Sequence, residues 1–206
     1  MPARFPERIV CLTEETTETL YLLGEERRIV GISGYTVRPP RARREKPRVS
    51  AFLSAKHDAI LALKPDLVLG FSDLQADIAR DLAKAGLNVV LFNQRSVDEI
   101  LSMVLMLASM IGATARGETL VRELEANLSK VRAAAAQLGK RPKVYFEEWD
   151  EPMISGIRWV SELVTLAGGE DIFVERSHSQ AATGRIVVPN EVLKREPEII
   201  IASPHR

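Results

Sequence analysis

The sequence of 206 residues contains little cysteine, little histidine and no net charge. Its single cysteine, Cys11, excludes an internal disulfide, and the apolar stretch around it favours a small buried hydrophobe over a reactive thiol. The three histidines are dispersed, and none has a companion at metal-ligand spacing. With 28 basic and 28 acidic residues, the overall charge does not attract nucleic acid or an anionic membrane. We therefore expect no metal centre, no nucleic-acid partner and no resident cofactor.

Long apolar runs are also missing. The longest, Ile100 to Ile111, is about half of the roughly 20 residues that a membrane-spanning helix needs, so it predicts a buried helix and no membrane insertion. The residues before the first strand-like stretch, "RIVCL", lack an apolar segment of signal-peptide length. The chain as written therefore carries no export signal, and a cytoplasmic location stays open.

Motifs of common enzymes are absent as well. The sequence has no G-x-S-x-G elbow, no G-x-G-x-x-G fingerprint and no Walker loop, which argues against a hydrolase, a dehydrogenase or an NTPase. One dense group of carboxylates could hold a cation or perform acid/base chemistry. Its members are Glu147, Glu148, Asp150 and Glu151. We favour a strand end followed by a solvated turn for this group, and keep an enzyme that uses Glu148 as the less favoured alternative.

A basic stretch runs from Arg38 to Arg48, where six of eleven residues are positive and three are proline. It contains no aromatic residue on which a base could stack. The stretch therefore predicts a solvated loop that helps to attract an anionic ligand.

The chain contains an internal repeat. "LALKPDLVLG" at 61–70 resembles "LKREPEIIIA" at 193–202, and "LYLLGEERRIVGI" at 20–32 resembles "LVTLAGGEDIFVE" at 163–175. In the first pair a helical pattern ends at Lys64 or Glu196, because the residue before a proline is disfavoured in the α region. A buried strand then follows. The two halves thus carry the same order of elements.

Strands alternate with helices in both halves, which predicts an α/β protein whose parallel sheets are covered on both faces. Between Ser96 and Leu138 the pattern is helical only, divided at Gly112. Capping boxes are predicted at Ser72 with Gln75 and at Ser96 with Glu99. Further strands are predicted at "KVYFEE", "DIFVE" and "EIIIAS". The organisation expected is an N-terminal α/β lobe at 1–95, a helical segment at 96–140 and a C-terminal α/β lobe at 141–206.

The order of segments "RIVCLTEETTETLYLLGEERRIVGIS", "ILALKPDLVLG", "YFEEWDEPMISG", "LAGGEDIF" and "VLKREPEIII" resembles the substrate-binding proteins of ABC importers for cobalamin, iron siderophores and haem. The cobalamin-binding members are the most similar. The resemblance implies two Rossmann-like lobes joined by a long rigid backbone helix, with a ligand held between the lobes. It also implies a periplasmic or cell-surface location and a permease partner. The family pattern continues beyond "EIIIASPHR", so the second lobe is expected to be incomplete and to expose an edge strand.

The resemblance also implies which residues contact the ligand. Matching segments place ligand-binding side chains at Tyr35, Phe52, Phe71, Trp149 and Met153. Flat aromatic and apolar groups in loops after strands can enclose a flat apolar ligand. In the loop "ERSHSQAATGRIV", His178 and Arg185 could bind a carboxylate or phosphate, or could be solvated.

Permease docking in this family uses an acidic residue on each lobe. The nearest candidates are Asp73 or Asp77 in the first lobe and Glu191 in the second, although ordinary solvated carboxylates fit these positions equally well. The function expected is capture of a corrinoid or an iron chelate, such as cobalamin or a ferric siderophore, and its delivery to an ABC importer without catalysis. An intracellular carrier of the same ligands remains the alternative.

Overall fold

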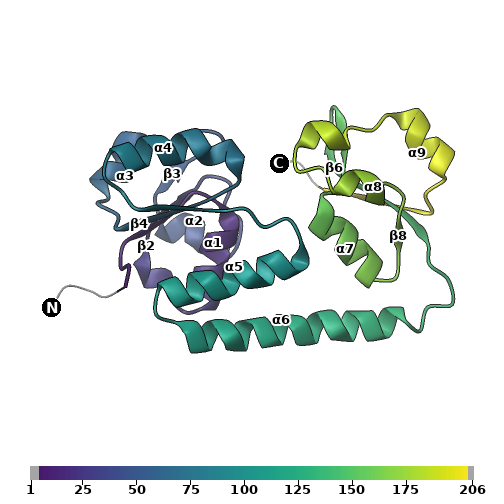
Figure 1. The fold of residues 1–206 in the computed structure, drawn as a ribbon, viewed down its shortest axis with the longest axis horizontal. Helices are drawn as coiled ribbons and strands as arrows, with labels where there is room; N and C mark the ends of the chain where they lie inside the picture. Colours follow the sequence, from purple (N-terminus) through teal and green to yellow (C-terminus); the bar gives the residue numbers. More distant parts are fainter. Residues whose placement is uncertain (1–4, 204–206) are drawn as a thin grey trace. The chain divides into compact units, whose positions relative to one another are not determined.

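A computed structural model describes residues 5–203 of the protein, which form an α/β fold (Figure 1). The chain divides into two compact units. Unit 1 contains the described residues through Gln94 together with Leu101–Arg122, and unit 2 contains Arg95–Ile100 and the described residues from Glu123 onward.

Unit 1 begins with alternating strands and helices and ends in two longer helices. Its elements are β1 (Ile9–Cys11), α1 (Glu14–Leu22), η1 (Glu26–Arg28), β2 (Ile29–Ser33), α2 (Ala42–Glu45), β3 (Arg48–Ser50), α3 (His57–Ala62), β4 (Leu67–Phe71), η2 (Asp73–Gln75), α4 (Ala76–Lys84), β5 (Val89–Phe92), most of α5 (Val97–Met110) and the first part of α6 (Thr114–Ala135).

The five strands of unit 1 form one parallel sheet in the order β3-β2-β1-β4-β5. Alternate side chains of β1 enter different cores, because successive residues of a strand point to opposite faces. Ile9 and Cys11 pack with residues of α1, α5 and α6, whereas Val10 packs with residues of α3 and α4. Figure 1 shows α4 and α5 on opposite sides of the strands. The sheet is therefore covered on both faces, as the sequence predicted.

Unit 2 is built around one long strand. Its elements after α6 are β6 (Lys143–Asp150), β7 (Met153–Ser155), α7 (Arg158–Leu166), β8 (Glu170–Asp171), α8 (Val174–Ser177), η3 (Ala182–Arg185), α9 (Pro189–Arg195) and β9 (Ile199–Ala202). The strand β6 pairs in parallel with β8 and β9 and antiparallel with β7. The three isoleucines of β9 are exposed by 42–64%, so the prediction of a buried strand after Pro197 is wrong for the described structure.

Three predicted elements differ from the structure. The basic stretch 38–48 contains α2 and ends at the first residue of β3, so it is not a continuous loop. The segment "DIFVE" continues as a strand only through Asp171, where the Phe173 N–H donates to Asp171 Oδ1 at 2.9 Å and turns the chain into α8. Phe173 is completely buried against Tyr145, with ring centroids 5.7 Å apart, so core packing prevails over strand propensity there. The sheet of unit 2 is mixed, because β7 pairs antiparallel with β6.

The helix ends predicted from prolines and from the capping box at Ser96 agree with the structure. Lys64 and Glu196, the two residues before the repeated prolines, both adopt left-handed backbone angles, with φ of 47° and 52°. Both helices have ended by that point. The capping box at Ser96 is confirmed, since the Ser96 N–H donates to Glu99 Oε2 at 3.0 Å and the Glu99 N–H donates to Ser96 Oγ at 3.2 Å.

The apolar run from Ile100 to Ile111 lies in and just after α5, and Met103, Val104, Leu107 and Ala108 are buried in the core of unit 1. This confirms the buried helix. Among the residues that the structure describes, none of the helices combines the length and hydropathy needed to cross a membrane.

Candidate ligand-binding site

Three of the predicted ligand-binding aromatics lie at one edge of the sheet in unit 1. Tyr35 and Phe52 each follow the last residue of a strand, β2 or β3, by two positions, and Phe71 is the last residue of β4. Because the strands are parallel, their carboxyl ends meet at the same edge, where open α/β sheets bind ligands. Tyr35 is 57% exposed, Phe52 is half-buried and Phe71 is buried.

Gln75 holds three segments of this edge together. It is completely buried; its Oε1 accepts from the Phe71 N–H at 3.0 Å, and its Nε2 donates to Phe52 O at 2.9 Å and to Leu12 O at 3.4 Å. Gly70 leaves room for the amide, since a Cβ there would lie 2.6 Å from Gln75 Oε1. The predicted capping box at Ser72 is wrong, because Gln75 makes these contacts and only Ser72 Oγ acts as a cap, accepting from the Leu74 N–H. Sequence reasoning missed this positioning role.

The loop that carries Tyr35 is tied to the neighbouring strand. The Gly34 N–H donates to Ser50 O at 2.7 Å, and the Tyr35 N–H donates to Ser33 Oγ at 3.2 Å. The ends of β2 and β3 are therefore connected directly, which fixes the backbone on which the phenol ring of Tyr35 stands.

Buried oxygen atoms that lack a hydrogen-bond partner within residues 5–203 accumulate at the same edge. They are Thr13 Oγ1, Thr36 Oγ1, Ser50 Oγ and Gln94 Oε1. Each belongs to a residue that ends a strand or follows one within three positions. Buried polar groups are satisfied in native proteins, so these oxygens are places for water or for polar atoms of a ligand. Polar residues directly after apolar runs were the signal in the sequence.

The predicted contacts of unit 2 lie on the hairpin formed by β6 and β7. Trp149 pairs with Ile154, and Asp150 pairs with Met153. The Trp149 side chain is 47% exposed, and its indole N–H donates to Glu151 O at 3.0 Å. Met153 is half-buried and packs against the cluster around Tyr145 and Phe173. The hairpin thus presents an exposed indole from a backbone held by the core.

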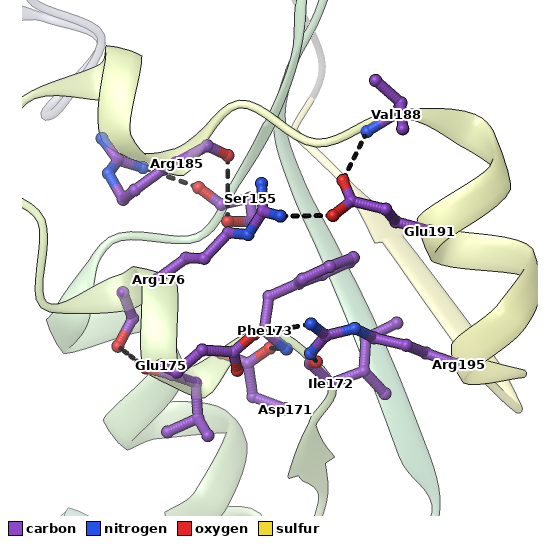
Figure 2. A network of polar contacts seen from close by, with 12 residues as sticks. Ser155, Asp171, Ile172, Phe173, Glu175, Arg176, Arg185, Val188, Glu191 and Arg195 are labelled. Atoms are coloured by element: carbon purple, nitrogen blue, oxygen red, sulfur yellow. Dashed lines mark hydrogen bonds and ion pairs between the residues drawn. The ribbon is translucent and has the colours of Figure 1, made fainter.

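Arg185 lies beside the same hairpin, with its guanidinium held by protein groups. It is 2% exposed, donates to Ser155 O at 2.6 Å, and forms a two-pronged ion pair with Glu148 at 2.5 and 3.1 Å. Ser155 Oγ donates back to Arg185 O at 3.1 Å (Figure 2). This pair joins β6, β7 and η3, and it gives Glu148 a structural partner. Ligand contact by Arg185 stays a prediction.

The acidic residues predicted for docking are engaged locally. Glu191 accepts from the Val188 N–H at 3.2 Å and pairs with Arg176, as Figure 2 shows, so it caps α9. Asp77 pairs with Arg80 at 2.6 Å, and Asp73 Oδ1 accepts from Ser72 Oγ at 3.0 Å. Docking through these residues stays a prediction.

His178 follows α8, is exposed, and lines a cavity formed by unit 2 alone. Within residues 5–203, no group of three or more histidine, cysteine, aspartate or glutamate side chains could hold a metal ion.

Comparisons with known proteins agree with this architecture. The model of the family described as "Periplasmic binding protein" matches residues 9–206. The vitamin B12-binding protein of Yersinia pestis is 28% identical over 207 residues, which cover 98% of this chain and 71% of that protein.

Solved structures are similar over nearly the whole chain. The periplasmic vitamin B12-binding protein of Vibrio cholerae has a TM-score of 0.79 and 25% identity, over 96% of this chain and 76% of that one. A periplasmic haem-binding protein from Roseiflexus sp. RS-1 has a TM-score of 0.83 and 23% identity, over 95% and 76% of the two chains. A possible iron-binding protein of Staphylococcus epidermidis has a TM-score of 0.81 and 21% identity, over 97% and 78%. These likenesses confirm the predicted fold class.

Proposed function

Because the chain belongs to the periplasmic binding protein family, we propose that it captures a corrinoid or an iron chelate and delivers it unchanged to the permease of an ABC importer. The names of the relatives support this range of ligands, since they include vitamin B12-binding, haem-binding and iron-binding proteins. Relatives described as periplasmic support a site of action outside the cytoplasmic membrane.

The observation that carries the proposal is the convergence of Tyr35, Phe52 and Phe71 on one sheet edge. Tyr35 is 57% exposed, so covering its ring with a flat apolar ligand lowers the free energy of the complex. The hydroxyl of Tyr35 can remain in contact with water. The hydrogen bonds of Gln75 position Phe52 and Phe71 before any ligand arrives, which lowers the entropy lost on binding.

In unit 2, Trp149 and Met153 are the proposed contacts. The indole of Trp149 is nearly half exposed on a hairpin that the core holds in place. The proposed role of Trp149 and Met153 is stacking and apolar contact with the ligand, without a chemical reaction. The pairing of Glu148 with Arg185 favours a structural role for that carboxylate over acid/base chemistry.

The proposal is tested by titrating the purified protein with cyanocobalamin, cobinamide, haem and a ferric siderophore. Quenching of Trp149 and Trp159 is followed with inner-filter correction, and the variant Trp149→Phe assigns the signal. Saturable binding of one compound is expected. Tyr35→Ala and Phe52→Ala should each weaken it by roughly 5- to 30-fold, since loss of one stacking ring costs about 1–2 kcal/mol.

Met106→Ala is the matched control, because that side chain is 51% exposed on α5 and is not among the proposed contacts. Its affinity should equal that of the parent protein. Absence of binding to all four compounds would contradict the proposal. Equal affinities in Tyr35→Ala, Phe52→Ala and Met106→Ala would contradict it as well.

A further inference from the structure

Unit 2 contains a cavity that the proposed function does not use. It has a volume of about 800 Å³ and lies between the C-terminal half of α6, the helix α7 and the segment around α8, beside the first turn of α5. All of its lining residues belong to unit 2. Ligand pockets for small molecules typically occupy about 300–1,000 Å³, so the cavity is large enough for one.

One wall of the cavity is apolar. Leu128 and Leu138 of the α6 region face it together with Leu166 of α7, and Leu138 is 55% exposed. Gly168 brings the end of α7 against α6, because a Cβ at this position would lie only 3.0 Å from Leu138 and 3.1 Å from Ala135. Gly168, Ala135 and Leu138 all line the cavity at this close approach.

Three basic side chains, those of Arg132, Arg141 and Arg158, and two acidic ones, those of Asp98 and Glu162, line the cavity. Arg158 pairs with Glu162 at 2.8 Å, while the second oxygen of Glu162 accepts from the Val97 N–H at 2.8 Å. Arg141 also lines the cavity and donates to Gly169 O. Arg132 lines it too, and its guanidinium has no ion pair or hydrogen bond with any residue in the described range. A cation is therefore available beside the apolar wall.

Ser161 supplies the second, independent feature. It lines the cavity, is 2% exposed, and its Oγ lacks a hydrogen-bond partner among the described residues. A buried hydroxyl without a partner is unfavourable, because nothing replaces the hydrogen bonds that it made to water. A ligand oxygen, or a water held by one, would remove this cost.

We propose that this cavity is a second binding site, which takes a small amphipathic organic anion. The anionic group lies against Arg132 and the hydroxyl of Ser161, and the apolar body covers Leu128, Leu138 and Leu166. Arg158 and Glu162 form a one-to-one ion pair, so the net positive charge of the lining comes from Arg132 and Arg141 set against Asp98. The site is independent of the aromatic edge of unit 1 and of the proposed ligand.

The test uses a matched pair of fluorescent probes: 1-anilinonaphthalene-8-sulfonate, which carries an anionic group, and N-phenyl-1-naphthylamine, which has the same rings without the sulfonate. The sulfonate is expected to bind at one site per chain and more tightly than the amine. Arg132→Ala should weaken its binding by about fivefold or more, as the loss of one charge-assisted contact predicts. Thr165→Trp should block it, since Thr165 is an exposed residue of the lining.

Lys130→Ala is the control, because it removes the same charge from the same helix outside the cavity. Equal effects of Lys130→Ala and Arg132→Ala, binding at many sites, or equal affinity for both probes would overturn the proposal. Loss of probe binding in a natural gene product that extends beyond Arg206 would show that polypeptide fills the cavity, and would overturn it as well. Titrations with cyanocobalamin and haem should not change in Arg132→Ala, which separates this site from the proposed function.

Discussion

Replacement of Gln75 by leucine tests whether one buried amide organises the candidate site of unit 1. Leucine is similar in volume but removes the acceptor for the Phe71 N–H and the donor to Phe52 O, which lie 3.0 and 2.9 Å away. The N–H of buried Phe71 loses the Gln75 oxygen as its acceptor, and Phe52 O can regain water because that residue is only half-buried. An unsatisfied buried group costs about 1–3 kcal/mol, so we expect a loss of about 2–3 kcal/mol in the stability of unit 1.

The two units carry different probes, which makes the measurement specific. Cys11 is the only cysteine, is completely buried in unit 1, and has a pKa that burial raises to about 11, so its thiol is labelled only when unit 1 opens. Trp149 and Trp159, the only tryptophans, report on unit 2. In a urea series, Gln75→Leu should shift the labelling of Cys11 to lower urea and leave the fluorescence transition in place.

Gln137→Leu is the control, because Gln137 is exposed beyond the end of α6. The Gln75→Leu variant should also bind the ligand more weakly, because the Gln75 side chain no longer links the backbone of Phe52 to that of Phe71. A change in unit 1 of less than about 0.5 kcal/mol, as expected for an ordinary surface substitution, would refute the reasoning. An equal shift of the fluorescence transition would do the same.

Two further substitutions probe buried charges. Arg185→Met leaves Glu148 without its partner, but the Glu148 side chain is 36% exposed and can be solvated, so we expect unit 2 to lose about 1–3 kcal/mol in urea denaturation followed by tryptophan fluorescence. Full stability in this variant would show that the pair is dispensable. Burial raises the pKa of Glu25, but hydrogen bonds from Arg28 and Arg116 outweigh it and hold the pKa below its ordinary 4.5. The ionised form is therefore favoured in the folded state, and its stabilisation, present above pH 4.5, is lost as pH falls through the lowered pKa. Glu25→Gln should make the stability of unit 1 fall less steeply as the pH is lowered below about 4.5, and an unchanged pH dependence would contradict this.

Features that depend on neighbours in the sequence were predictable. The apolar runs indicated most of the strands, although not β3 or β7, and the residues before Pro65 and Pro197 ended their helices because the proline ring restricts the preceding backbone. The capping box at Ser96 and Glu99 formed because both partners lie within one turn. The same reasoning placed Tyr35 and Phe52 after strands, and hence at the carboxyl edge of a parallel sheet.

Features that depend on partners far away in the sequence could not be predicted. Gln75 has the spacing of a capping residue, yet its amide bonds to Leu12 and Phe52, which come from other loops. In the sequence Arg185 looked like a free cation in a polar loop, but Glu148, 37 residues earlier, holds it. The short segment at Phe173 has strand propensity, and burial of its ring against Tyr145 decided otherwise.

The sequence by itself therefore determined the alternation of strands and helices and the helical stretch from Ser96 to Leu138, because these follow from local periodicity and backbone restrictions. It indicated the family through the order of segments that resemble known members. Only the tertiary structure decided which polar side chains are paired, which oxygens stay unsatisfied and where a cavity remains. Hydrogen bonds and packing join residues whose separation along the chain carries no signal, so their partners emerge only when the chain has folded.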